Sequence, residues 1–325
     1  DAIFRVFSMS KPVTSVALMM LHEEARFHLD DPVARYIPAF KDTPVFDGVA
    51  SDGKVRLTKQ ERPMTVRHLL THTSGLSYGS SNVAALDAIY QAAGLRDWSQ
   101  TLAQVMEKLA QVPLLYQPGS EWRYSLSIDL VGHLVEVLSG LPLDVYLRER
   151  IFGPLGMVDT GFCVPPAKEA RLARLYAPAE EGGLEDVSGR LPASGFKMLS
   201  GGGGLFSTTR DYWRFAQMLC NGGELDGARL LGRKTVDIIA SNHIPTAMLP
   251  FVPPGWPYRL GYGMGLGVRV LLQPSAAEMP GSEGLFTWGG AASTGFWVDR
   301  KEQLVGVCML QCMPAMSRVN QDFRI

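Results

Sequence analysis

The last third of the chain reads as a series of short strands, and this feature most restricts the possible folds. Apolar strand-like runs cover residues 262–272, 285–288, 295–299 and 304–311, and a polar turn at 300–303 joins the last two. Strands that follow one another through short turns pair antiparallel, because a parallel pair needs a long crossover connection. Helical patterns dominate earlier in the chain. The sequence therefore predicts an α+β fold with an antiparallel sheet flanked by helices.

Helical patterns fill most of the region between residues 66 and 160. Thr65 suits the N-cap of a helix over residues 66–73 that Gly75 closes. Further helical patterns cover residues 86–94, 98–109, 129–139 and 143–151, and a helix after Thr208 has Asp211 in place for a capping box. Residues 41–63, 165–200 and 242–258 read as loops.

We expect these elements to form two lobes with an active site between them. An α/β lobe with the antiparallel sheet would combine residues 1–60 with residues 200–325, and residues 61–199 would form a mainly helical lobe. The chain of 325 residues is long enough to bury a large core in this way.

Composition excludes several classes of partner. The net charge is −1 and the basic residues are scattered, so no nucleic-acid partner is expected. The apolar runs are far shorter than the ~20 residues of a membrane-spanning helix. The four cysteines lack metal-site spacing and read as buried thiols. With no visible signal peptide, a cytoplasmic location is expected, although the chain starts with Asp1. The oligomeric state stays open.

A possible nucleophile lies close to the start, in the tetrapeptide from Ser8 to Lys11. A serine three residues before a lysine on a helix shares its face, with Cβ atoms about 5–6 Å apart. A serine needs a neighbouring base to attack a carbonyl, and a buried lysine can act as one. The apolar helical run 12–24 that follows provides the burial. Similar tetrapeptides at 51–54 and 194–197 lie in loop-like sequence and lack such a helix.

Two further motifs carry chemistry. Tyr124-Ser125-Leu126 follows a Pro-Gly turn and precedes a helix, where a tyrosine can project into a cleft. Trp288-Gly289-Gly290 lies on one of the predicted strands. Paired glycines weaken a strand and commonly mark a place where the backbone closely approaches a ligand.

Together, Ser-x-x-Lys, Tyr-Ser-x and Trp-Gly-Gly, with Leu70-Thr-His-Thr-Ser-Gly-Leu76 between them, resemble the motifs of the serine β-lactamase-like superfamily. Within it, the chain looks like the family VIII carboxylesterases, which are relatives of class C β-lactamases. The resemblance covers nearly the whole chain and implies a β-lactamase/transpeptidase-like fold. In that family a helix and strands precede the nucleophile, whereas only seven residues precede Ser8 here, and whether the chain is a fragment of a longer protein stays open.

The resemblance also implies a role for each motif residue. Ser8 would be the acylated nucleophile, Lys11 its proton acceptor, and Tyr124 the general base and acid. The backbone N–H groups of Ser8 and Ala291 would form the oxyanion hole. Such preorganised donors typically contribute ~3–4 kcal/mol each. No metal and no cofactor are implied.

The chain departs from the β-lactamase pattern at two places. Trp288 stands where those enzymes carry a polar or cationic side chain that holds the substrate carboxylate. Leu126 stands where they carry an asparagine that binds the substrate amide. Trp288, Gly289, Gly290 and Leu126 are therefore expected to line a substrate site that favours a neutral ester.

We accordingly expect a serine carboxylesterase that hydrolyses small short-acyl esters through an acyl-enzyme, with weak β-lactam hydrolysis as a side activity. A β-lactamase or D-alanyl peptidase, an acyltransferase and a non-catalytic scaffold of the same fold remain as alternatives.

Three other motifs compete with this interpretation. Residues 75–79 match the Gly-x-Ser-x-Gly elbow of α/β-hydrolases around Ser77, with His243 as a triad partner, but no buried strand precedes them. His68 and His72 have the spacing of a metal pair, without the intervening glutamate of a zinc protease helix. The glycines 201–204 lack the Gly-Lys-Ser/Thr ending of a phosphate-binding loop and favour a turn lining the cleft.

Overall fold

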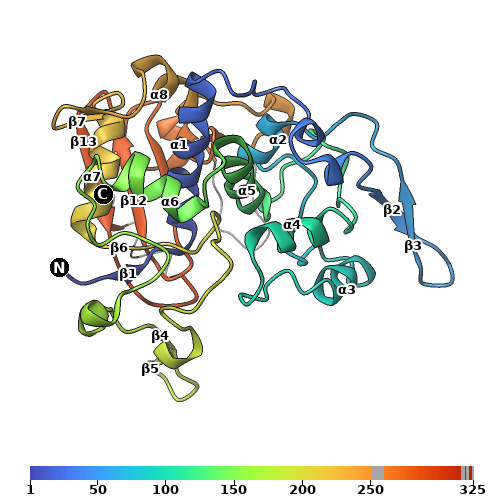
Figure 1. The fold of residues 1–325 in the computed structure, drawn as a ribbon, viewed down its shortest axis with the longest axis horizontal. Coiled ribbons are helices and arrows are strands. Elements are labelled where there is room, and N and C mark those ends of the chain that lie inside the picture. Colours follow the sequence, from blue (N-terminus) through green and yellow to red (C-terminus); the bar gives the residue numbers. More distant parts are fainter. Residues whose placement is uncertain (251–259, 316–318, 320–321, 324–325) are drawn as a thin grey trace.

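A computed structural model describes residues 1–250, 260–315, 319 and 322–323. Its largest sheet has five antiparallel strands in the order β13-β12-β11-β10-β9 (Figure 1). The strands are β9 (Tyr262–Met264), β10 (Arg269–Leu271), β11 (Phe286–Gly289), β12 (Gly295–Asp299) and β13 (Leu304–Cys308). The predicted antiparallel sheet and α+β class are confirmed.

The prediction of one strand over residues 262–272 is wrong, because β9 and β10 form a hairpin there. The Gly265 N–H donates to the Val268 carbonyl at 2.8 Å and closes the turn. Gly267 has a φ of +79°, and a Cβ atom added to it would lie 2.0 Å from Ser15 Oγ. The hairpin turn thus lies directly against the helix that carries Lys11, and only glycine permits both the conformation and the contact.

Helix α1 (Ser10–Glu23) runs through the interior. Its residues from Ser10 to Leu21 are all buried, as the apolar pattern predicts. It packs against α5 (Ser127–Ser139), while α7 (Thr209–Cys220) lies against β12 and β13 (Figure 1). The structure therefore holds the Ser8–Lys11 segment between the sheet and the helical region.

The predicted helices of the central region are confirmed, with bounds that differ by a few residues. They are α2 (Val66–Leu70), α3 (Ala84–Ala92), α4 (Leu102–Leu109), α5 and α6 (Leu143–Leu147), and a π-helical turn, Arg148–Phe152, extends α6. Thr65 caps α2, because its Oγ1 accepts from the His68 N–H at 3.3 Å and His68 Nδ1 accepts from the Thr65 N–H at 3.2 Å. Two further short helices are α8 (Arg233–Ile239) and α9 (Pro274–Ala277).

Four two-stranded antiparallel pairs complete the fold. They are β1 (Phe4–Arg5) with β6 (Phe206–Ser207), β2 (Val45–Val49) with β3 (Val55–Thr58), β4 (Tyr176–Pro178) with β5 (Leu184–Asp186), and β7 (Glu224–Leu225) with β8 (Ala228–Arg229). The segments 41–63 and 165–200, predicted as loops, each contain one of these hairpins. The β2–β3 hairpin projects away from the body of the protein (Figure 1). Part of the predicted loop 242–258, residues 251–258, lies outside the described residues.

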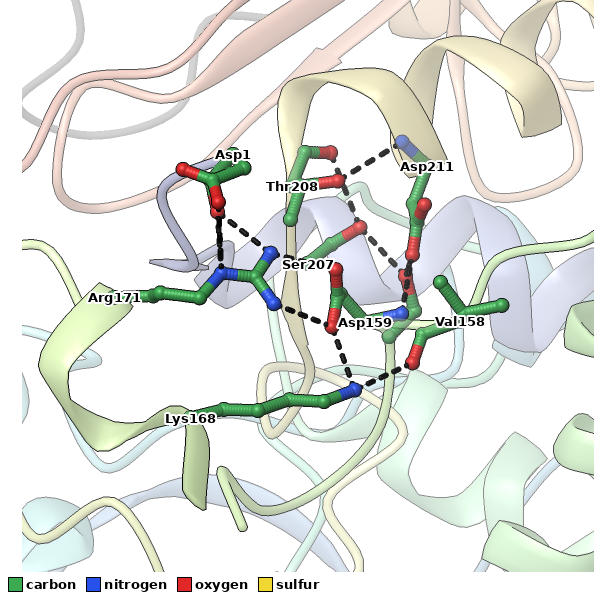
Figure 2. A network of polar contacts seen from close by, with 9 residues as sticks. Asp1, Val158, Asp159, Lys168, Arg171, Ser207, Thr208 and Asp211 are labelled. Atoms are coloured by element: carbon green, nitrogen blue, oxygen red, sulfur yellow. Dashed lines mark hydrogen bonds and ion pairs between the residues drawn. The ribbon is translucent and has the colours of Figure 1, made fainter. Parts of the chain in front are cut away.

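The predicted capping box of α7 is only half formed. Thr208 Oγ1 accepts from the Asp211 N–H at 3.1 Å, as expected. The Asp211 carboxylate instead accepts from the Asp159 N–H at 2.7 Å and from Thr160 Oγ1 at 3.0 Å (Figure 2). Asp159 in turn pairs with Arg171 and with Lys168, each at 2.6 Å. The carboxylate of Asp211 thus ties the start of α7 to the segment before it.

The prediction of four buried thiols is wrong for two of them. Cys163 is exposed and Cys308 is partly exposed, whereas Cys220 and Cys312 are buried. Cys163 lies in irregular structure between the π-helical turn and the 3₁₀ turn Pro166–Arg171.

Among the described residues, no single helix is long and apolar enough to cross a membrane, although the bent pair Ser127–Ser139 and Leu143–Phe152 passes that test by length and composition. The division into two lobes stays a prediction.

Candidate active site

Ser8 lies in a tight turn at the start of the buried helix. A 3₁₀ turn, Phe7–Met9, runs directly into α1, and Phe7 has a left-handed φ of 45°. A non-glycine residue rarely adopts this conformation, and such strained residues cluster at functional sites. Ser10 Oγ donates to the Phe7 carbonyl at 2.7 Å and accepts from the Leu205 N–H at 3.0 Å, which holds the turn in place. Ser8 itself stays partly exposed.

Lys11 is fully buried and its side-chain nitrogen lies beside Ser8. Nζ donates to Ser8 Oγ at 3.2 Å and to the Gly202 carbonyl at 2.6 Å. The expected one-turn spacing thus brings both side chains together. The second contact comes from the glycine turn 201–204, whose carbonyl, and not its amide, faces the lysine. A phosphate-binding loop would present N–H groups instead.

Tyr124 reaches Ser8 from the segment before α5. Its hydroxyl donates to Ser8 Oγ at 2.5 Å, and Lys11 Nζ lies 4.6 Å from the centre of its ring. Three residues that are far apart in sequence therefore meet at one oxygen atom. This arrangement matches the predicted nucleophile, proton acceptor and general base, whose roles stay proposals.

The end of β11 lies against the Ser8 turn. A Cβ atom added to Gly290 would lie 2.5 Å from the Val6 carbonyl oxygen, so only glycine fits there. Thr294 Oγ1 donates to the same carbonyl at 3.2 Å and fixes the other side of the β11–β12 connection. Ala291, the predicted second oxyanion donor, is exposed in this connection.

The predicted substrate residues differ in exposure. Gly289 is partly exposed, whereas Trp288 and Leu126 are 3% and 5% exposed. The Trp288 ring stacks on His72 with centroids 6.3 Å apart and lies 5.9 Å from the ring of Tyr124. Trp288 is therefore buried against the rings of His72 and Tyr124. Contact of Trp288 or Leu126 with a substrate stays a prediction.

Sequence reasoning missed Asp129, and it placed Gly202 in a turn lining the cleft without a contact to Lys11. Asp129 Oδ1 accepts from Ser200 Oγ at 2.5 Å and from the Gly202 N–H at 3.2 Å. Burial raises the pKa of the Asp129 carboxyl, while the nearby Lys11 charge and these two hydrogen bonds oppose the rise. A buried aspartate in the first turn of an otherwise apolar helix is the sequence signal that could have found it.

Tyr78 and His72 also belong to the site, and both come from the segment after α2. The ring of Tyr78 lies 5.4 Å from that of Tyr124 and 5.8 Å from Lys11 Nζ. Burial raises the pKa of Tyr78 well above its usual range, and the neighbouring Tyr124 and Asp129 add to this. His72 is fully buried, 5.0 Å from the ring of Tyr124. Burial, followed by the Lys11 charge, lowers the pKa of His72 well below its usual range, so the imidazole is neutral.

The competing motifs do not assemble into other sites. Ser77 is fully buried in a loop after α2, and its Oγ accepts from the Gly79 N–H at 3.1 Å. His243 is occupied elsewhere, by Arg67 and by the Ile238 carbonyl. His68 and His72 do not share a helix face, because α2 ends at Leu70. In the part of the chain that the structure describes, no three His, Cys, Asp or Glu side chains are grouped for a metal ion.

Comparisons with known proteins agree with this geometry. The Beta-lactamase family model matches residues 1–325. Protein Rv1367c of Mycobacterium tuberculosis is 34% identical over 98% of this chain and 79% of its own length. Esterase EstB of Burkholderia gladioli is 31% identical over 92% of this chain and 75% of its own.

A solved structure extends the likeness to three dimensions. EstCE1, described as a hydrolase with promiscuous acyltransferase activity, superposes with a TM-score of 0.81 at 28% identity, over 100% of this chain and 84% of its own. The resemblance to β-lactamase-like esterases is thereby confirmed, as is the β-lactamase/transpeptidase-like fold. The chain that brings Ser8, Lys11 and Tyr124 to one point thus belongs to the Beta-lactamase family and is a serine hydrolase.

Proposed function

We propose that the protein is a carboxylesterase that hydrolyses small, neutral, short-acyl esters through an acyl-enzyme on Ser8. The observation that carries this proposal is the position of Ser8 Oγ, which accepts from Tyr124 at 2.5 Å and from Lys11 at 3.2 Å. A hydroxyl held between a basic amine and a phenol has a route for its proton on either side.

Acylation follows from these distances. Ser8 Oγ attacks the ester carbonyl carbon while its proton passes to the Lys11 amine, which becomes an ammonium. The negative oxygen of the tetrahedral intermediate accepts from the N–H groups of Ser8 and Ala291. When the alcohol leaves, its oxygen takes the proton of the Tyr124 hydroxyl, and the phenolate regains a proton from Lys11. Every proton is then accounted for, and Ser8 carries the acyl group.

Deacylation repeats these steps with water as the attacking group in place of Ser8. As the water oxygen attacks the acyl carbon, the water gives one proton to Tyr124, which passes its own hydroxyl proton to the Lys11 amine. The bond to Ser8 Oγ then breaks, and the serine oxygen recovers that proton. The product acid leaves and the starting state returns.

Preference for a neutral ester is supported by the side chains around Ser8. Tyr78 and Tyr124 present aromatic rings near it, and Trp288 and Leu126 replace the polar groups expected in a β-lactamase. A substrate carboxylate or amide would therefore lose hydrogen bonds on entering this site. Ester turnover should exceed nitrocefin turnover by a wide margin, whereas comparable rates would favour the β-lactamase alternative.

The test is intact mass spectrometry after incubation with a fluorophosphonate. The wild type should gain one adduct, Ser8→Ala should gain none, and Ser77→Ala should react like the wild type. An adduct that persists in Ser8→Ala would overturn the assignment of the nucleophile. An unmodified wild type would favour a non-catalytic scaffold.

Acyl transfer is a second candidate, favoured by the likeness to EstCE1, whose description includes promiscuous acyltransferase activity. The acyl-enzyme can pass its group to an alcohol as readily as to water if the alcohol occupies the site. Adding acceptor alcohols to an ester hydrolysis assay and measuring the transfer product separates the two activities. The cytoplasmic location stays a prediction.

A further inference from the structure

Asp129 is a buried carboxylate that contacts the glycine turn 201–204, and this turn contacts Lys11. It is 2% exposed and lies in the first turn of α5. Its Oδ1 accepts both the Ser200 hydroxyl and the Gly202 N–H. A carboxylate with two donors at a helix N-terminus is stabilised in its charged form, which offsets part of the cost of burial.

The turn connects this carboxylate to the lysine through a single residue. Gly202 donates its N–H to Asp129 and offers its carbonyl to Lys11 Nζ at 2.6 Å. Thr14, one helical turn after Lys11, donates from Oγ1 to the adjacent Gly201 carbonyl at 2.8 Å. Helices α1 and α5 thus both hold the turn, because Thr14 and Asp129 bind the two ends of the peptide group between Gly201 and Gly202. The next peptide group, between Gly202 and Gly203, presents its carbonyl to Lys11 Nζ.

The close fit leaves no room for a side chain at Gly201 or at Gly202. A Cβ atom on Gly202 would lie 2.4 Å from Asp129 Oδ2, and one on Gly201 would lie 2.9 Å from Thr14 Cγ2. At Gly203, one residue later, the nearest atom would be 3.9 Å away. The glycines are required where the turn meets Asp129 and Thr14.

Several charged or titratable groups face Lys11. Tyr124 and Tyr78 approach with their rings, and neutral His72 lies behind Tyr124. Arg96 lies over the far part of this cluster, 5.8 Å from the centre of the Tyr78 ring. Of these groups, only Asp129 is an acid whose charge opposes that of an ammonium at neutral pH, and its pKa responds to Lys11.

We propose that Asp129 is a positioning residue, which holds the Gly202 carbonyl against Lys11 and stabilises the ammonium that forms when Lys11 takes the Ser8 proton. This rests on the proposed Ser8–Lys11–Tyr124 mechanism. An indirect link through Gly202 suits this role, because a direct ion pair would draw Nζ away from Ser8.

The experiment measures the pH dependence of kcat/KM, and of fluorophosphonate labelling, for Asp129→Asn. The amide keeps an acceptor oxygen for Ser200 and Gly202 but removes the charge. Lys11 should then hold a proton less well, so the acid limb of both profiles should move to lower pH by at least about half a unit. The rate on the plateau should fall about tenfold, because Lys11 becomes a weaker base.

Two further variants separate this role from a structural one. Asp211→Asn is the matched control, because Asp211 is also buried, at 3% exposed, and its carboxylate accepts from the Asp159 N–H and Thr160 Oγ1 instead of from the turn that holds Lys11 (Figure 2). It should lower Tm and leave the acid limb in place. Ser200→Ala keeps the Asp129 carboxyl but removes a hydrogen bond that lowers the pKa of Asp129. A smaller fraction of Asp129 is then charged in the acid range, so a smaller shift in the same direction is expected. This variant decides the question if Asp129→Asn does not fold.

An acid limb that stays in place in the folded Asp129 and Ser200 variants, or that moves to higher pH, would overturn the proposal. The proposed function fails separately, through persistence of the adduct in Ser8→Ala. If the Asp129 and Ser200 variants react with the fluorophosphonate and their pH profiles do not shift, only the role of Asp129 is contradicted.

Discussion

Two acid–base networks in this protein use similar residues in opposite ways. Near the surface, Asp159 pairs directly with Arg171 and Lys168 at 2.6 Å (Figure 2). In the interior, Lys11 makes no ion pair within the described residues and is linked to Asp129 through the backbone N–H and carbonyl of Gly202. Arg171 and Lys168 are therefore both paired with the Asp159 carboxylate, whereas the buried Lys11 can still donate a hydrogen bond to Ser8 Oγ.

The difference shows how one pairing chemistry can serve stability in one place and reactivity in another. Direct pairs near water contribute little individually, because both ions were well solvated before pairing. A buried lysine without a direct partner is costly to charge. A negative charge nearby lowers that cost.

The largest difference in kcat/KM is expected between the variants Lys11→Met and Lys168→Met. We expect the first to lower kcat/KM by at least about 10³-fold, because it removes the proton acceptor. The second removes a surface partner of Asp159 and should leave kcat/KM within about twofold. Steady-state ester hydrolysis on both variants checks this, and similar losses in the two would show that the interior lysine has no special role.

Tyr124→Phe should lower kcat/KM by about 10²-fold, because it removes the hydroxyl that protonates the leaving alcohol. Tyr36→Phe is its control, since Tyr36 also donates a short hydrogen bond, to Asp31 at 2.6 Å, but lies outside the site. The ratio of kcat/KM between the two variants is the measurement. A Tyr124→Phe enzyme at the wild-type rate would refute the role of Tyr124 in proton transfer.

Gly202→Ala tests the residue that links Asp129 to Lys11 through its backbone N–H and carbonyl. The added Cβ would lie 2.4 Å from Asp129 Oδ2, so the turn must shift and its carbonyl must leave Lys11. Overpacking of this kind costs about 1–3 kcal/mol of unfolding free energy, and we expect kcat/KM to fall about tenfold. Gly203→Ala has room and should change neither quantity. Urea unfolding and ester hydrolysis on both variants distinguish these outcomes.

The smallest effect is expected at the surface. The hydrogen bond from Arg171 is the largest cause that lowers the pKa of Asp159, to about 2, and Lys168 adds to it. A pKa lowered in the folded state contributes stability above the ordinary value of 3.8, and that contribution is lost as pH falls towards 2. Asp159→Asn should therefore lower Tm modestly at pH 7, and the difference from the wild type should vanish near pH 2. A constant difference across this range would contradict the assignment.

Local patterns in the sequence predicted the elements well where the physics is local. The apolar run after Lys11, the cap at Thr65 and the strands after residue 285 follow from spacing and turn chemistry within a few residues. Ser8 and Lys11 were within reach for the same reason, because one helical turn brings them together. Tyr124 was found through its motif, and its distance to Ser8 was not predictable.

Contacts between distant segments were beyond the sequence. The β9–β10 turn depends on how closely Gly267 approaches Ser15, and Asp129 depends on where residues 200–204 pass over α5. Tyr78 was seen only within a false nucleophile motif, although its ring lies beside that of Tyr124. Each of these features is fixed by tertiary packing, which no local period encodes.

The site draws on residues 8–11, 124–129, 200–202 and the β11–β12 connection, so it exists only when these segments have met. Pairings between such distant parts of a chain form slowly during folding, because long loops must close first. In a nascent or partly folded chain, Ser8 would lack its contacts with Lys11 and Tyr124 and would not be an activated nucleophile. Appearance of fluorophosphonate labelling during refolding would consequently report the last stage of assembly, well after the helices have formed.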